Sequence, residues 1–138
     1  QQRLPQVRSL MDTVINAERI GPTWDSAAGD MFMFQERRPD VPRSAIVGGD
    51  FNFTSAHPEY PLVCGEMSVY GRLGTTQHLA DAWIAAGNSE DGVESFPSEG
   101  RIDHVVVTHD LAPKVKKAWI GHGIVASDHW PLFVEFDL

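Results

Sequence analysis

The 138-residue chain is about the length of one ordinary domain, given the usual range of roughly 100 to 200 residues for each. Its 42% hydrophobic and 22% charged content is typical of a folded globular protein and excludes a disordered or fibrous chain. The net charge of −8 argues against a protein that binds nucleic acid through a basic surface of its own, because such binding needs cations that displace counterions.

The chain holds a single cysteine, Cys64, so it cannot form an internal disulfide. Cys64 follows Leu62 and Val63, and these apolar neighbours predict a buried, inert thiol. No apolar run approaches the ~18 residues that a membrane-spanning helix needs, and we expect no transmembrane segment.

Apolar side chains recur at helical spacing near the start of the chain and predict an amphipathic helix that ends at Gly21 and Pro22. These side chains are Leu4, Val7, Leu10, Met11, Val14 and Ile15. Residues 23–43 are irregular and contain several aromatic side chains, which leaves two interpretations: a lid over a site, or a surface insertion. Residues 44–48 form a short apolar run and predict a buried strand.

Two short helices are predicted next. Ser55 is the candidate cap of the first, which extends to Cys64 with Pro58 in its first turn. The second covers residues 79–86, with Gly87 just after its end. Strands are predicted at residues 94–96, 102–108, 115–120 and 132–138. Together these elements predict a single unit over residues 1–138, of class α/β (α+β), with one mostly antiparallel sheet and helices on one side.

The strand at residues 44–48 leads through two glycines into Asp50 and Asn52. In an extended backbone, residues two apart point to the same side. A carboxylate beside an amide suits phosphate chemistry, because the acid can orient a water molecule and the amide can hold an oxyanion. Asp50 and Asn52 are therefore candidate catalytic residues.

Two other strand ends carry acids: Asp103 lies just inside one strand, and Asp128 with His129 precedes the last. The three strand ends could converge on one rim of the sheet. The Asp128 carboxylate suits Mg²⁺ or Mn²⁺, while a histidine is kept charged or correctly oriented by a second carboxylate. Asp103 is the natural partner for His129, because nothing in its strand neutralises it. Taken alone, Asp103 could equally form a salt bridge with Arg101.

Three stretches, in their order and spacing, resemble the last three signature motifs of the endonuclease/exonuclease/phosphatase superfamily. They are Gly49-Asp50-Phe51-Asn52, Arg101-Ile102-Asp103-His104-Val105 and Ser127-Asp128-His129-Trp130-Pro131-Leu132. The stretch Ser95-Phe96-Pro97-Ser98 also resembles the family's approach to the strand of the second motif. The superfamily comprises metal-dependent phosphohydrolases, among them deoxyribonuclease-like nucleases, abasic-site endonucleases, inositol polyphosphate 5-phosphatases and neutral sphingomyelinases.

The resemblance implies a role for each residue of the motifs. Asp50 would orient or deprotonate the attacking water, and Asn52 would hydrogen-bond the phosphoryl oxygens. His129, oriented by Asp103, would stabilise the phosphate or act as an acid. Asp128 would lie at the metal, directly or through water, with Asp50 and Asn52 near the same Mg²⁺ or Mn²⁺. The implied reaction is metal-assisted in-line attack of water at phosphorus.

The resemblance also has a gap. Family members are four-layer αββα sandwiches whose first half supplies an Asn, the principal metal-binding Glu and a His, and none of these has a match here. We therefore expect the chain to be the C-terminal half of such a domain, one sheet of the sandwich with its flanking helices. Its apolar sheet face would be covered by the missing half or by self-association.

Three functional alternatives remain open from the sequence. The first is a divalent-metal-dependent phosphoester hydrolase, most naturally a phosphodiesterase, to which this chain contributes half of the site. The second is a catalytically incomplete fragment that only folds or binds with a partner. The third, a nuclease, ranks below small or lipid phosphoesters because of the net charge of −8.

Overall fold

The computed structural model describes residues 3–20, 42–90 and 92–138, so most of the predicted loop at residues 23–43 lies outside the described part. Helices α1 (Arg3–Ile15) and α2 (Ala17–Ile20) come first, followed by strand β1 (Ile46–Asp50) and helix α3 (Glu59–Cys64). A small hairpin follows, β2 (Glu66–Ser68) and β3 (Gly71–Leu73), and then β4 (Ala80–Asp81) and α4 (Ala82–Ala85). The last elements are β5 (Asp103–Val107), a 3-10 turn (Ala112–Lys114), β6 (Val115–Ile120) and β7 (Leu132–Phe136).

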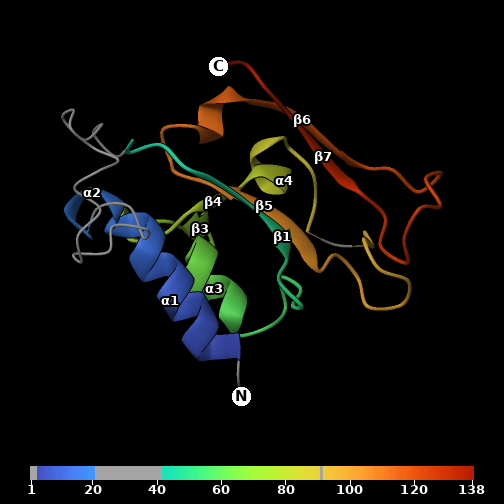
Figure 1. Ribbon diagram of the computed structural model, residues 1–138, viewed down its shortest axis with the longest axis horizontal. Helices are drawn as coiled ribbons and strands as arrows, with labels where there is room; N and C mark the ends of the chain where they lie inside the picture. Colours follow the sequence, from blue (N-terminus) through green and yellow to red (C-terminus); the bar gives the residue numbers. More distant parts are fainter. Residues whose placement is uncertain (1–2, 21–41, 91) are drawn as a thin grey trace, which may run out of the picture.

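The strands pair in antiparallel fashion, which confirms the predicted mixed class. Hydrogen bonds divide the described strands into three sheets: β1-β5-β4, the hairpin β2-β3 and the long hairpin β6-β7. In Figure 1, α1 and α3 lie on one side of β1 and β5, while β6 and β7 lie on the other. The prediction of one sheet was therefore too simple, because β6 and β7 pair with each other and not with β5.

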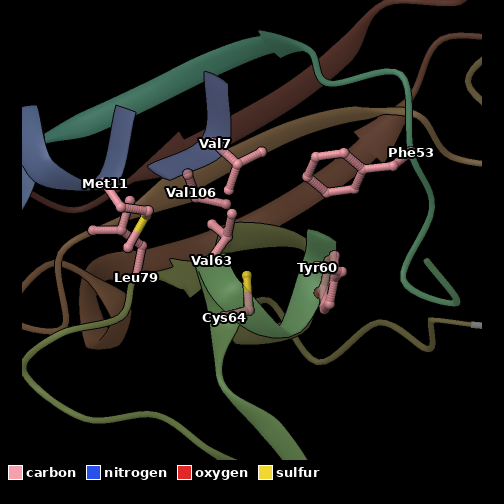
Figure 2. Close-up of a cluster of buried hydrophobic side chains, with 8 residues drawn as sticks. All are labelled: Val7, Met11, Phe53, Tyr60, Val63, Cys64, Leu79 and Val106. Atoms are coloured by element: carbon pink, nitrogen blue, oxygen red, sulfur yellow. The ribbon is translucent and has the colours of Figure 1, made fainter. Parts of the chain in front are cut away.

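Strand β5 is buried on both faces and separates two apolar cores. Its Val106 lies in the first core, with side chains from α1 and α3 (Figure 2). Its neighbour Val107 lies in the second core, with Ala82 of α4 and Val115 of β6. Because successive strand residues point to opposite faces, one strand serves both cores. Helices therefore cover both faces of the central sheet, and the prediction that all of them lie on one side was wrong for α4.

Several element boundaries differ from the predictions for local reasons. Ser55 caps no helix: α3 begins four residues later, with Pro58 in the cap position. The helix predicted at residues 79–86 starts at Ala82, because the Asp81 carboxylate accepts a hydrogen bond from Trp83 N at 2.8 Å and caps it there. Residues 94–96 form no strand, and only one bridge, Phe96 to Gly100, occurs there.

Strand β1 was predicted to be buried, but most of it is exposed. Ile46 retains 47% of its surface, and Gly48, Gly49 and Asp50 are also exposed. The strand lies at the edge of its sheet, next to β5 only. Val47 packs against the first core, whereas Ile46 stays largely exposed within the described residues.

A buried, hydrogen-bonded cluster is formed by Arg101, Asp81 and Tyr60. Arg101 Nη2 donates to Asp81 Oδ2 at 2.6 Å, and Tyr60 Oη donates to the same oxygen at 2.7 Å. Burial alone would raise the pKa of Asp81, but the contacts that His104 and Arg101 make with its carboxylate hold this pKa well below the usual range. Arg101 thus pairs with Asp81, and Asp103 is left free for another partner.

The thiol of Cys64 is buried in α3, as the sequence predicted. Burial raises its pKa to about 12, which keeps it protonated and unreactive at neutral pH. In the part of the chain that the structure describes, no helix is long and apolar enough to cross a membrane.

Candidate active site

The pairing of β1 with β5 places two predicted site residues opposite each other. Asp50 and Asp103 are partners in the antiparallel register. Phe51 N donates to Ile102 O at 2.9 Å, so the adjacent pair, Asp50 and Asp103, is the non-hydrogen-bonded kind in which side chains lie closest. Two carboxylates facing each other repel, and this arrangement favours any cation that lies between or beside them.

Asn52 reaches Asp50 by a turn and not by strand alternation. Its backbone is left-handed, with a φ of 55°, so the extended geometry assumed from the sequence ends at Asp50. The backbone N of Asn52 donates to Asp50 Oδ1 at 2.8 Å, and its Nδ2 donates to Asp50 Oδ2 at 3.0 Å. The two side chains are therefore held together, although the reason differs from the one inferred from the sequence.

Asp103 and His129 form a hydrogen-bonded pair across 26 residues of sequence. His129 Nδ1 lies 2.8 Å from Asp103 Oδ2, and both side chains are only partly exposed. The hydrogen bond that His129 donates to Asp103 raises the pKa of His129, burial lowers it somewhat, and the negative charges of Asp103, Asp50 and Asp128 raise it further. The three carboxylates therefore stabilise the charged form of the imidazole relative to the neutral one.

Asp128 is exposed at the start of the turn that carries His129. Its Oδ1 accepts a hydrogen bond from Ser127 Oγ at 3.2 Å, and Ser127 Oγ also accepts from His129 N at 3.1 Å. Its charge acts on His129, which places Asp128 in the same electrostatic environment as Asp50 and Asp103. All five predicted site residues therefore belong to one region of the molecule.

Sequence reasoning missed the residues whose side chains bond to the backbone of the Asn52 turn. Arg3 of α1 donates from Nη1 to the Asn52 carbonyl oxygen and forms an ion pair with Glu59 of α3 at 3.2 Å. His104 Nε2 lies 2.7 Å from the Phe53 carbonyl oxygen, and its Nδ1 lies 2.8 Å from Arg101 Nη1. The Phe53 carbonyl oxygen only accepts, so Nε2 of His104 donates to it, while Nδ1 faces both Arg101 Nη1 at 2.8 Å and Asp81 Oδ2 at 3.5 Å. No sequence motif indicates contacts across such long separations.

Two hollows adjoin Trp130, the residue after His129. One, of about 320 Å³, is lined by Asp103, His129 and Trp130 together with residues of the loop before β7. The other, of about 500 Å³, is lined by Trp130 with Thr54 and Ser55 from the segment after Asn52. The smaller hollow is therefore the one into which the Asp103–His129 pair opens.

The oxygen ligands near Asp50 suit a hard cation, but there are few of them. Carboxylate and amide oxygens of Asp50, Asn52 and Asp128 are the ligand types that Mg²⁺ prefers. Within residues 3–20, 42–90 and 92–138, no three His, Cys, Asp or Glu side chains gather closely enough to hold a metal ion. This set fits an ion that takes one or two carboxylates from this part of the chain and keeps other ligands from elsewhere.

One comparison with known proteins gives a match, and it is to a family. The profile of the Endonuclease/Exonuclease/phosphatase family matches residues 8–129, a span that runs from α1 to the histidine of the pair. No curated protein and no solved structure gave a significant match. The family match confirms the resemblance noted in the three motifs, and the chain belongs to the endonuclease/exonuclease/phosphatase family, a group of metal-dependent phosphoester hydrolases.

Proposed function

We propose that the chain hydrolyses phosphodiesters by in-line attack of water at phosphorus, with Asp50, Asn52, Asp103 and His129 as its catalytic residues. The observation that carries the proposal is the meeting of the three motifs: Asp50 faces Asp103 across the sheet, and Asp103 holds His129 at 2.8 Å. Each residue then has a role that its hydrogen bonds allow.

Asp50 acts on the attacking water. Each carboxylate oxygen accepts one hydrogen bond from Asn52 and retains a second lone pair for the water. The Asn52 amide has a second N–H beyond the one given to Asp50, and this N–H holds a phosphoryl oxygen. The pair thereby fixes the water and the phosphorus on a common line of attack.

His129 acts on the phosphoryl group from the side opposite to the attacking water. Nδ1 is engaged by Asp103, and Nε2 has no hydrogen-bond partner among the described residues, so it can donate to a phosphoryl or leaving oxygen. The raised pKa of His129 favours retention of that proton. General acid help of this kind contributes roughly 10²- to 10⁴-fold in rate.

Mg²⁺ or Mn²⁺, when bound, supplies neutralising charge at the phosphoryl oxygens, and Asp128, Asp50 and Asn52 are the residues that would hold it. The exposed Asp50, the edge position of β1 and the small number of donors support a site that a further polypeptide segment completes. In this proposal the chain is the C-terminal half of a sandwich, and the segment that completes the site supplies the other metal ligands.

The test is hydrolysis of bis-p-nitrophenyl phosphate with added Mg²⁺ or Mn²⁺. Turnover that is lost in Asp50→Ala and His129→Ala supports the proposal. His109→Ala is the matched control, because His109 follows the other end of β5 and its removal should leave the rate unchanged. An absence of turnover above the blank overturns the proposal for this chain and favours the incomplete fragment.

The substrate proposal is a small or lipid phosphodiester. The net charge of −8 disfavours a long polyanion, because each phosphate contact needs a cation on the protein. Plasmid nicking at a rate comparable to that on the small diester would instead favour the nuclease alternative.

A further inference from the structure

We infer that Ser95 is a positioning residue that sets the distance between Asp103 and His129 by bonding to the backbone beside each of them. The inference deepens the proposed function, because it names the residue that holds the catalytic pair together. It rests on geometry around a side chain that has no exposed surface.

On the Asp103 side, the Ser95 hydroxyl is a double acceptor. Its Oγ receives hydrogen bonds from Ile102 N and Asp103 N, both at 3.0 Å. A hydroxyl oxygen has two lone pairs, so one serine satisfies both buried N–H groups. The first residue of β5 is thereby fixed by a side chain that belongs to no strand of its own.

On the His129 side, the same residue uses its backbone. The Ser95 carbonyl oxygen accepts a hydrogen bond from Trp130 N at 2.7 Å, and Trp130 directly follows His129. The next side chain, Phe96, packs edge-to-face against the His129 ring, with the ring centres 4.9 Å apart. Residues 95 and 96 therefore contact the chain on both sides of the Asp103–His129 hydrogen bond.

Ser95→Ala would remove the side-chain oxygen that accepts from Ile102 N and Asp103 N. Both N–H groups would lose that partner, Ile102 N in a buried position, and the start of β5 would shift to find another. The carbonyl contact with Trp130 would remain. The expected result is a displacement of Asp103 relative to His129, and not a general loss of structure.

The first experiment uses the unaltered chain. Amide hydrogen exchange followed by NMR should show that the N–H groups of Ile102, Asp103 and Trp130 are protected, because each donates to Ser95. Exchange of Asp103 and Trp130 at the rate of an unstructured peptide would overturn the inference without any substitution.

The second experiment follows the His129 Nδ1 proton, which lies in the hydrogen bond to Asp103, by its NMR chemical shift in three variants. Ser95→Ala should move this resonance upfield, because the hydrogen bond to Asp103 lengthens. Ser95→Thr, which keeps the hydroxyl, should preserve the wild-type chemical shift. Val63→Ala is the matched control, since it weakens the core around α1 and α3 and leaves the contacts of Ser95 intact.

A folded Ser95→Ala variant in which the His129 Nδ1 proton keeps its wild-type chemical shift contradicts the inference. If Ser95→Ala does not fold, Ser95→Cys takes its place with the same two outcomes, because a thiol is a weak acceptor of similar size. If neither variant folds, the exchange measurement decides alone. None of these readouts needs turnover, so an inactive chain with the expected chemical shifts would overturn the proposed function and retain this inference.

Discussion

At the scale of single residues, the site is defined by the charges of three carboxylates and one imidazole. Asp50 and Asp103 face each other across β1 and β5, and Asp128 adds a third carboxylate nearby. The His129 imidazole, whose pKa these carboxylates raise, is hydrogen-bonded to this group through Asp103. The protonation of one ring therefore controls the net charge at the place where the phosphate is proposed to bind.

The first prediction concerns Asp103→Asn. The variant loses the strongest cause of the raised His129 pKa, so this pKa should fall towards 6.5, measured by NMR titration of the imidazole. Asp110→Asn, beyond the other end of β5, should leave it unchanged. A His129 pKa that stays raised in Asp103→Asn would show that the hydrogen bond is not the cause.

The same pKa shift links the pair to stability with a definite sign. The folded-state pKa of His129 lies above its unfolded value, so the pair's contribution is fully present below about pH 6.5. It is lost as the pH rises through the raised folded pKa. Urea denaturation of the wild type and Asp103→Asn should therefore differ most at acidic pH and converge at alkaline pH.

At the scale of elements, the loop between Ser95 and Arg101 holds Ser95 in position as well as leading the chain into β5. Its single bridge, Phe96 to Gly100, returns the chain so that Ser95 N bonds to Gly100 O at 3.0 Å. Gly100 has a φ of 85°, which side chains rarely adopt, and a Cβ there would lie 3.2 Å from Thr54 Cγ2. The loop thus depends on one glycine to bring Ser95 to the start of β5.

The second prediction follows from that glycine. Gly100→Ala should lower the free energy of unfolding by about 1–2 kcal/mol, because the left-handed backbone is strained for an L-residue. Gly123→Ala, where φ is not positive and a Cβ meets open space, should leave stability unchanged or slightly raised. Urea denaturation checks both, and equal effects in the two variants would contradict the strain argument.

Element prediction from the sequence succeeded where a pattern is local and periodic. Strand β6 has the predicted bounds, and α1 follows the helical spacing of its apolar residues. The pattern failed at Asp81, whose carboxylate caps α4, so that the helix starts three residues later than the apolar run suggested. It also failed at residues 94–96, where the chain is held by Ser95 and not by a neighbouring strand.

At the scale of the whole molecule, β5 joins the two apolar cores. Val106 is buried with α1 and α3, and Val107 is buried with α4, β6 and β7. Both cores therefore contain side chains of β5, the strand that begins at Asp103. We therefore expect the two halves of the described structure to unfold together.

The third prediction tests this coupling. Val106→Ala and Val107→Ala should each lower the free energy of unfolding by roughly 1.5–3 kcal/mol, since both side chains are fully buried. Circular dichroism and tryptophan fluorescence should report the same single urea transition in both variants. Val69→Ala, with 93% of its surface exposed, is the control that should change little. Two separated transitions would show that the cores unfold independently.

The sequence allowed the residues of the site to be predicted, but not the residues that hold them in position. Asp50, Asn52, Asp103, Asp128 and His129 lie in compact motifs, and their residue types are enough to indicate phosphate chemistry. Arg3, Ser95 and His104 act through contacts with the backbone of distant residues, such as Asn52 O and Phe53 O. A backbone atom has no residue type to match, so such contacts leave no pattern in a single sequence.

The hydrogen bond between Asp103 and His129 has one more consequence, which follows from the sheets that carry its two ends. Asp103 belongs to the sheet β1-β5-β4, whereas His129 lies in the connection between β6 and β7. No ladder hydrogen bonds join these two sheets in the described residues, so a slide of one past the other is resisted by packing and by a few single bonds. Because that slide would stretch the bond to His129, titration of the imidazole also measures how well the two sheets are aligned.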